Sequence, residues 1–237
     1  MKMPKISVII PTYNDDAEIL VKTIDSVLNQ KNINMELIVV DGGKAIINRK
    51  NIKVVRSKPK GIANAFNIGI HEASGDYLYF MGAGDYFNGE NVLCEMMESV
   101  NKDKDMLVVG RINRVSKNAE ILYTTKNNFK KWQLLYKMAI PHQGLFTNKK
   151  FFEKYGLFDE KCKYAMDYEL LLRAYKNFPE VVQKNIVVAN WEEGGVGQND
   201  TDKVIAEYHR IRVKNRIVSR WVLETIYGLT KWRYGYK

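Results

Sequence analysis

Three apolar segments of the chain each end in polar residues that could contact a bound ligand. These are residues 6–10 before Pro11-Thr12-Tyr13-Asn14, residues 37–40 before Asp41-Gly42-Gly43, and residues 77–81 before Gly82-Ala83-Gly84-Asp85. Near-continuous apolar runs of this length are typical of strands in a parallel sheet that is covered on both faces. Ligands bind just beyond the carboxyl ends of such strands, so the three polar ends are predicted to form one active-site rim.

The first two strand ends offer groups that suit the parts of a nucleoside. Tyr13 has a flat face for a base, Thr12 and Asn14 can form hydrogen bonds, and Pro11 fixes the exit from the sheet. Asp41 can accept hydrogen bonds from a base imide or from ribose hydroxyls. An Asp-Gly pair after a strand is also an ordinary turn. The pairing of the two strand ends favours the nucleoside site.

Asp85 indicates a different chemistry, namely the binding of a divalent cation. A carboxylate where phosphates lie repels them unless a cation lies between the two. Mg²⁺ and Mn²⁺ prefer oxygen ligands and commonly bridge a carboxylate to a diphosphate. Asp85 is therefore a candidate metal ligand, and a turn or helix-capping aspartate after glycine is the alternative.

The elements that must position these residues alternate between strand and helix over the first 110 residues. Asp15 or Asp16 can cap a helix with an apolar stripe from Ile19 to Leu28. Further strands are expected at 35–40, 52–55, 77–81 and 106–109, and further helices at 62–73 and 91–100. This alternation predicts an α/β fold with a single doubly wound, mostly parallel, Rossmann-like sheet.

The second half of the chain has a less regular pattern. We expect strands at 121–125, 145–147 and 181–189, and helices at 129–138, 149–155 and 167–175. No interdomain linker is visible, so one catalytic domain is predicted over residues 1–200. A basic, aromatic tail is predicted over 201–237, with a helix from residue 202 to about residue 226.

The positive charge of the chain is concentrated in this tail. Residues 203–237 contain nine basic and two acidic side chains, or +7 of the total net charge of +10. Apolar and aromatic residues alternate with the arginines, a pattern typical of a helix at an anionic membrane surface. A helix packed on the domain with a solvated charged face is the alternative. The nearly neutral body argues against a protein wholly devoted to nucleic acid, and no nucleic-acid partner is expected.

Composition indicates a folded protein in the cytoplasm, at most peripheral to the inner face of the membrane. The chain of 237 residues is 46% hydrophobic and 27% charged. No run approaches the 18 apolar residues of a membrane span, and residues 6–10 are too short for the apolar part of a signal peptide. Cys94 and Cys162 lie far apart without metal-ligand spacing, which indicates reduced thiols.

The order of motifs resembles glycosyltransferase family 2, whose members have the glycosyltransferase-A fold. The likeness covers most of residues 6–197. It rests on VIIPTYN (8–14), LIVVDGG (37–43), GIANAFNIGI (61–70), ASGDYL (73–78), GD (84–85), HQ (142–143), GLFD (156–159) and DYEL (167–170). Each motif is weak alone, but their succession is a strong signal.

The resemblance implies an inverting glycosyltransferase that moves a sugar from a nucleoside-diphosphate sugar to a hydroxyl of a growing, lipid-linked cell-surface glycan. A UDP-sugar is favoured from family frequency. Asp167 would be the general base, although capping of the following helix is the alternative. The donor nucleotide would contact Pro11, Thr12, Tyr13, Asn14, Asp41, Asn67 and Gly84. Acceptor or loop contacts would come from His142, Gln143, Glu169 and Gly195.

Two departures from the family pattern bear on the metal and the phosphates. The usual Asp-x-Asp is reduced to Asp85, so weaker binding of Mn²⁺ or Mg²⁺ is expected. Phe66 replaces a basic residue that usually precedes the position of Asn67, so phosphate contacts would come from the backbone or Lys60.

Two other functions are weighed against this one. A nucleotidyltransferase that makes nucleotide-sugars usually has a glycine- and arginine-rich loop after the first strand, where this chain has Pro-Thr-Tyr-Asn. A basic nucleic-acid-binding or scaffold protein would explain the tail but not the polar strand ends.

Overall fold

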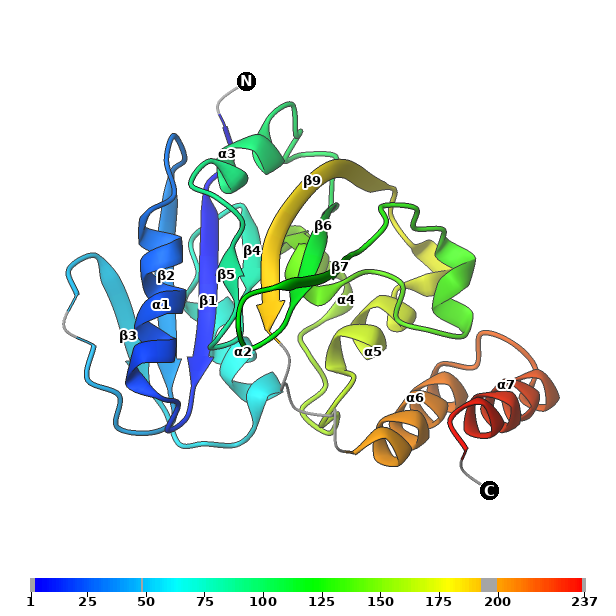
Figure 1. Cartoon of the computed structure of the whole chain (residues 1–237). Helices are drawn as coiled ribbons and strands as arrows, with labels where there is room; N and C mark the ends of the chain where they lie inside the picture. The colour runs from blue at the N-terminus through cyan, green and yellow to red at the C-terminus, as the bar shows by residue number, and fades with distance from the viewer. Residues whose placement is uncertain (1–2, 48, 193–199, 236–237) are drawn as a thin grey trace.

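The first half of the chain forms the parallel sheet that the sequence predicts. The computed structural model describes residues 3–47, 49–192 and 200–235 (Figure 1). Strands β3 (Ile52–Arg56), β2 (Met35–Asp41), β1 (Ile6–Thr12) and β4 (Tyr77–Phe80) lie side by side in that order, all parallel. The carboxyl ends of β1, β2 and β4 therefore meet at one edge of the sheet.

Helices α1 (Ala17–Leu28) and α2 (Ile62–Glu72) cover opposite faces of these strands. Ile24 of α1 belongs to the apolar cluster that contains Val8 and Ile10 of β1. Phe66 of α2 belongs to the other cluster, which contains Ile9. Alternate residues of β1 thus face different helices, as its period of two requires. The doubly wound arrangement is confirmed.

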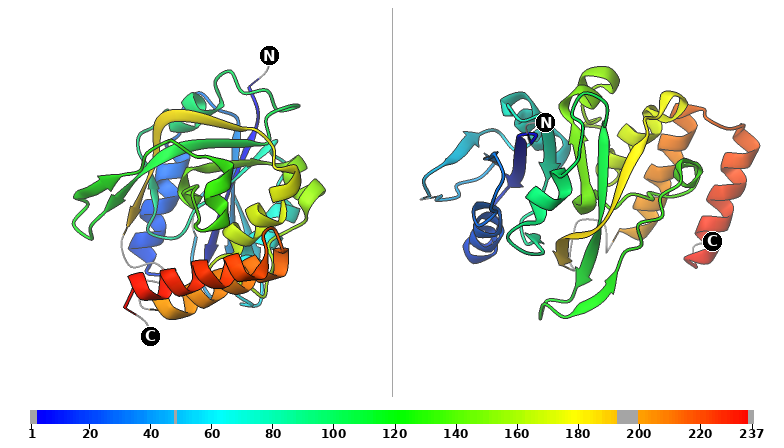
Figure 2. Two further views of the ribbon diagram at one scale, coloured as in Figure 1. Left: turned by 90° about the vertical axis from the view of Figure 1, so that its right-hand side faces the viewer. Right: turned by 90° about the horizontal axis from the view of Figure 1, so that it is seen from above.

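The second half extends the sheet with strands of both directions. The order is β3-β2-β1-β4-β8-β6-β9-β5, and β7 pairs with β6. The added strands are β5 (Tyr86–Phe87), β6 (Leu107–Val115), β7 (Ile121–Thr124), β8 (Leu145–Asn148) and β9 (Val181–Glu192). β9 is parallel to β6, whereas β8 is antiparallel to β4 and to β6. Figure 2 shows the long β6–β7 hairpin projecting from the curled sheet.

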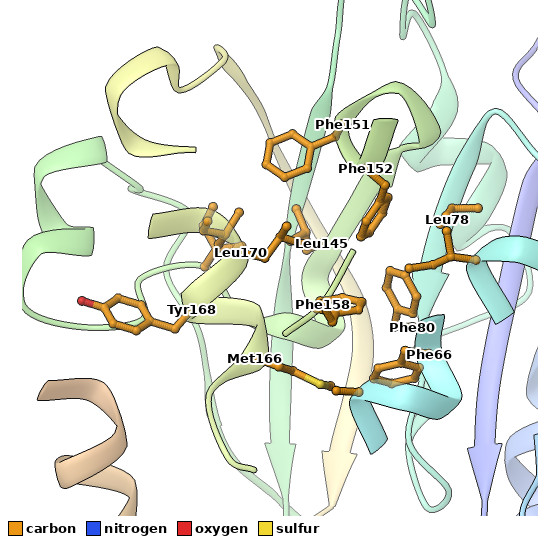
Figure 3. Packing of buried hydrophobic residues seen from close by; sticks show 14 of the residues in the cluster. Phe66, Leu78, Phe80, Leu145, Phe151, Phe152, Phe158, Met166, Tyr168 and Leu170 are labelled. Atoms are coloured by element: carbon orange, nitrogen blue, oxygen red, sulfur yellow. The ribbon is translucent and has the colours of Figure 1, made fainter. Parts of the chain in front are cut away.

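An aromatic cluster joins α2 to the sheet and to the segment before α5 (Met166–Arg173). The ring centroids of Phe66 and Phe80 lie 4.8 Å apart, and those of Phe80 and Phe158 lie 5.2 Å apart (Figure 3). Burial of one such side chain contributes about 1.5–3 kcal/mol. This cluster holds three separate segments of the chain beneath the candidate site.

The remaining helices of the body include two that match the sequence closely. Helix α4 (Lys149–Tyr155) follows β8, and α3 (Val92–Met97) lies within the predicted range 91–100. Three short 3₁₀ helices are η1 (Lys131–Leu135), η2 (His142–Gly144) and η3 (Tyr175–Asn177). The amphipathic α-helix predicted over 129–138 is wrong. Only η1 forms there, because the backbone leaves helical geometry at Tyr136 (φ −130°).

The predicted single helix of the tail is also wrong, since two helices form. Helix α6 (Thr201–Asn215) ends where Arg216 takes a left-handed conformation (φ 45°), and α7 (Arg220–Arg233) begins after Ser219. The short connection lets α7 fold back against α6, where the rings of His209 and Tyr227 stack at 4.2 Å. Among the described residues, every helix is too short or too polar to cross a bilayer.

Candidate active site

A cavity of about 1250 Å³ opens beyond the carboxyl ends of β1 and β4. Its wall unites strand ends and loops that are far apart in the sequence. The sequence-predicted residues in this wall are Pro11, Thr12, Tyr13, Gly84, Asp85, His142, Gln143 and Asp167. The predicted convergence of the first and third strand ends on one site is thus observed.

The end of β1 presents an open aromatic face to the cavity and carries a buried hydroxyl next to it. The Tyr13 side chain is 59% exposed. The hydroxyl oxygen of Thr12 is buried and has no hydrogen-bond partner within the described residues. A buried polar atom without a partner is uncommon in native proteins.

Asp41 and Asn14 lie behind this wall and shape the adjoining loop. The Asp41 carboxylate accepts hydrogen bonds from Gly43 N (2.7 Å) and Ala45 N (3.0 Å) and forms an ion pair with Arg56. A Cβ atom at Gly43 would lie 2.6 Å from Asn14 Oδ1, so the loop requires glycine there. Gly42, rather than Asp41, lines the cavity. A direct contact of Asp41 or Asn14 with a nucleoside stays a prediction.

Asp85 is a buried carboxylate on the cavity floor. It is only 6% exposed, and Gln143 Nε2 donates to its Oδ2 at 3.2 Å. Burial raises the pKa of Asp85 to about 7, helped by the nearby charge of Glu192 and opposed by the Gln143 hydrogen bond. Within the described residues, no cationic side chain forms an ion pair with Asp85. A bound cation would therefore find a carboxylate without a counter-charge.

Asp167 lies in the first turn of α5, across from His142. His142 Nδ1 and Asp167 Oδ2 are 3.7 Å apart, and Asp167 Oδ1 accepts from Tyr168 N at 2.7 Å. Ala165, not Asp167, is the N-cap of α5, so the alternative capping role is not realised. Burial lowers the pKa of His142, which keeps the imidazole neutral at pH 7.

The 3₁₀ helix η2 connects the two carboxylates, because its adjacent residues His142 and Gln143 face Asp167 and Asp85 respectively. Contacts with the neighbouring strands hold η2 in place. The Tyr79 hydroxyl donates to the Gln143 carbonyl at 2.6 Å. A Cβ atom at Gly144 would lie 2.6 Å from the carbonyl oxygen of the glycine at position 110, so η2 sits tightly on β6.

The start of α5 is held by a residue that the sequence did not reveal as part of the site. The Glu207 carboxylate of α6 accepts hydrogen bonds from the backbone N–H groups of Lys163, Tyr164 and Ala165, at 2.8–2.9 Å. The neighbouring Tyr208 lines the cavity and stacks on Tyr168 at 4.5 Å. One signal was available, since Glu207 is one of only two acidic residues in a strongly basic segment.

Two predicted contact residues lie in the framework rather than in the cavity wall. Asn67 is buried and forms two hydrogen bonds of 3.0 Å with the backbone of Phe158. Glu169 is fully buried and forms ion pairs with Arg173 (2.6 Å) and Lys214 (3.0 Å). Both side chains bind residues of other segments and so stabilise the packing of the chain. Gly195 lies outside the described residues.

The comparisons with known proteins agree with this geometry. Residues 7–166 match the family model described as Glycosyl transferase family 2. The chain belongs to this family, and it is a glycosyltransferase. A PGL/p-HBAD biosynthesis glycosyltransferase of Mycobacterium bovis is 28% identical over 238 residues, which cover 94% of this chain and 90% of that protein. Chondroitin synthase of Pasteurella multocida is 30% identical over 73% of this chain and 19% of that protein.

Solved structures place this glycosyltransferase in the glycosyltransferase-A fold. The crystal structure of S. aureus TarS 1–349 in complex with UDP matches with a TM-score of 0.67 at 18% identity, over 94% of this chain and 69% of that one. A longer TarS structure matches with a TM-score of 0.68, and this glycosyltransferase spans 42% of it.

Five lysines that come from four loops of the glycosyltransferase border the same cavity. They are Lys58, Lys60, Lys117, Lys126 and Lys163, all exposed. Sequence reasoning singled out Lys60 alone, because a loop lysine is ordinarily just solvated. Their common position on the rim surrounds the buried acidic floor with positive charge, which suits a ligand that carries phosphates.

The side chains around Asp85 determine what kind of metal ion this glycosyltransferase could bind. Within the described residues, no group of three or more His, Cys, Asp or Glu side chains could hold a metal ion. Asp85 is a single oxygen donor with room in front of it. Mg²⁺ and Mn²⁺ can be held by one or two carboxylates together with substrate phosphates. The site thus fits a cation that arrives with, or is completed by, a diphosphate.

Proposed function

We propose that this glycosyltransferase inverts the anomeric centre as it transfers a sugar from a UDP-sugar to a hydroxyl of a growing, lipid-linked cell-surface glycan. One observation carries the proposal. A single cavity holds an open aromatic strand end, a buried carboxylate for a cation and, linked through η2, a second carboxylate on a helix N-terminus. These are the three chemistries that such a displacement needs.

The donor nucleotide would lie at the β1 end of the cavity. The base would stack on Tyr13, whose ring is open to the cavity. Lys58 and Lys60 lie on the adjoining rim, where they would attract the diphosphate. Solved structures of S. aureus TarS with UDP and with UDP-GlcNAc support a uridine donor in this fold.

The acceptor hydroxyl would lose its proton to Asp167. As the hydroxyl oxygen bonds to the anomeric carbon, the bond from that carbon to the diphosphate oxygen breaks, and the proton moves to Asp167 Oδ. A single displacement from the opposite face inverts the centre. General-base assistance of this kind contributes ~10²–10⁴-fold. His142 lies 3.7 Å from the carboxylate and would orient it while remaining neutral.

Asp85 would hold Mn²⁺ or Mg²⁺ together with the donor diphosphate. When bound, such an ion offsets the negative charge of the departing nucleoside diphosphate. The Asp85 carboxyl must be ionised to hold it. A pKa near 7 makes that ionisation depend on the cation, because the positive charge would lower the pKa again.

The acceptor class and the location are proposed from the relatives. One relative is named for PGL/p-HBAD biosynthesis and another for chondroitin synthesis, which supports a glycan or glycan precursor as the acceptor. The rim lysines would favour a phosphate-bearing acceptor or donor. We place the reaction at the cytoplasmic face of the membrane, with no role for nucleic acid.

A panel of nucleotide-sugars tests the proposal. Release of nucleoside diphosphate is measured from UDP-, GDP- and dTDP-sugars, with Mn²⁺ and with a chelator. We expect thermal stabilisation and slow hydrolysis with a UDP-sugar and Mn²⁺ only, and the anomeric configuration of the product settles inversion. Release of pyrophosphate from a nucleoside triphosphate would instead favour nucleotide-sugar synthesis.

A further inference from the structure

Helix α7 presents an aromatic face to solvent. The side chains of Trp221, Leu229 and Trp232 are 73%, 61% and 80% exposed. Tyr234, just after the helix, is 57% exposed. Large apolar side chains are normally scattered over a surface, and their concentration on one helix indicates a binding surface.

These residues lie on one stripe, opposite the face that packs on α6. At about 3.6 residues per turn, positions 221, 225, 228, 229 and 232 fall within about 100° of the helix circumference. Leu223 is the buried residue of α7 and lies on the other side, as does Tyr227, which stacks on His209 of α6. The aromatic stripe is therefore the outward face of a helix that is already docked.

Basic side chains flank the stripe on both sides. In helical projection, Arg220 and Lys231 lie on one side, and Arg233 lies on the other. The acidic side chain of α7, Glu224, is within 3.5 Å of His209 and 3.7 Å of Arg220. Its charge is thus partly compensated within the helix pair, while residues 203–237 carry a net charge of +7.

We propose that α7 binds the surface of an anionic lipid bilayer, with Trp221 and Trp232 at the level of the headgroups. A helix of 14 residues is about 21 Å long, shorter than the ~30 Å hydrocarbon core, so it would lie in the plane of the interface. Aromatic rings beside arginines match the mixed apolar and anionic chemistry of that layer. A second copy of the chain fits less well, because it would bring the same positive charge against itself.

The position of α7 gives this docking a consequence for the cavity. Tyr208 of α6 forms part of the cavity wall, and α7 packs on α6. Figure 1 shows both helices at the lower end of the molecule, the end toward which β1 and β2 point, and the right view of Figure 2 shows α7 as the outermost element, with α6 between it and the body. Because α6 borders the cavity, a bilayer under α7 would lie one helix away from it, within reach of a lipid-linked acceptor. That last step rests on the proposed function, whereas the docking does not.

Co-sedimentation of the full chain with vesicles tests the docking without any sugar donor. Wild type should bind vesicles of phosphatidylcholine with 30% phosphatidylglycerol at least tenfold more tightly than pure phosphatidylcholine. Trp221→Ala/Trp232→Ala should weaken binding to the anionic vesicles about tenfold or more. Arg220→Gln/Arg233→Gln should do the same, since each basic side chain near such a surface contributes roughly fivefold.

Matched substitutions elsewhere control for a general loss of apolar area or charge. Trp132→Ala removes another exposed tryptophan, and Lys104→Gln/Lys176→Gln removes two exposed charges outside the tail. Both should bind as wild type does. Circular dichroism and melting temperature establish that each variant is folded. Brominated lipids should quench the tryptophan fluorescence of wild type but not that of Trp221→Ala/Trp232→Ala.

Three results would overturn the proposal. Equal binding to both kinds of vesicle would remove the electrostatic part, and equal losses in the control variants would remove the α7 face. A wild-type dimer that Trp221→Ala/Trp232→Ala converts to monomer, with no binding to vesicles, would assign the stripe to a second copy of the chain. Because the vesicle experiment contains no sugar donor, a negative result would overturn the docking without bearing on the proposed transfer reaction.

Discussion

At the scale of single residues, two carboxylates of this glycosyltransferase lie in different surroundings. Asp85 is buried on the cavity floor, where desolvation raises its pKa to about 7. Asp167 lies in the first turn of α5, beside His142. We propose a cation at the first position and proton transfer from the acceptor at the second.

Asp167→Asn tests whether Asp167 is the general base. Glu169, a buried carboxylate two residues away, provides the comparison. The amide cannot accept a proton, so kcat should fall ~10²–10⁴-fold while KM for the donor changes little. Glu169→Gln serves as the control. It weakens the contacts with Arg173 and Lys214, so it should lower the free energy of unfolding by about 1–3 kcal/mol and spare kcat at low temperature. Full transfer activity in Asp167→Asn would contradict the assignment.

Asp85 makes stability depend on pH in a defined direction. Its pKa is about 7 in the folded chain and near 3.8 in the unfolded one, so the native state binds more protons between those values. The free energy of unfolding should therefore fall as pH rises from about 4 to about 7. Asp85→Asn should remove this slope, with a gain on the order of a few kcal/mol at pH 8 and little change at pH 4. Urea unfolding at several pH values measures it, and parallel curves for the two proteins would count against a raised pKa.

At the scale of elements, the candidate site depends on how α6 holds the start of α5. Glu207 accepts three backbone hydrogen bonds from residues 163–165, immediately before the helix that carries Asp167. Backbone donors at a helix entrance must be satisfied, and a carboxylate there also suits the dipole. The helix start that carries Asp167, the proposed general base, is thus held by a residue about 40 positions further along the chain.

Glu207→Ala should therefore lower kcat about tenfold without removing any group from the reacting atoms. The double variant Glu207→Ala/Asp167→Asn should be no slower than Asp167→Asn, because the two residues act as one unit. The control is Glu224→Ala, the other acidic residue among residues 203–237, which should leave kcat unchanged. Additive losses in the double variant would show that Glu207 acts independently of Asp167.

The sequence predicted the elements that are defined by continuous apolar runs and strong caps. β1, β2 and β4, with the Asp16 cap of α1, follow from local pattern alone. The sequence did not predict features that depend on contacts with distant parts of the chain. The apolar spacing near residue 131 indicates a helix, yet the chain leaves helical geometry at Tyr136. Asn67 and Glu169 belong to matching motifs, but only the packed chain shows that they bind Phe158, Arg173 and Lys214.

At the scale of the whole molecule, the two C-terminal helices have different attachments to the body. α6 buries Ile205, Ile211 and Arg212 and supplies Tyr208 to the cavity wall. α7 buries Leu223 and packs on α6. The predicted division between a domain over 1–200 and a tail over 201–237 therefore separates Glu207 and Tyr208 from the site that they complete.

Two truncations locate the boundary of the catalytic unit. A chain that ends at residue 219 loses α7 and the burial of Leu223, so its free energy of unfolding should fall by only about 2–3 kcal/mol. It should keep donor hydrolysis and lose vesicle binding. A chain that ends at residue 200 should lose hydrolysis, because the entrance of α5 loses its acceptor Glu207 and the cavity loses Tyr208. Melting curves separate misfolding from inactivity. If the shorter chain hydrolysed its donor at the wild-type rate, α6 would belong to the tail, and the site would be complete without Glu207.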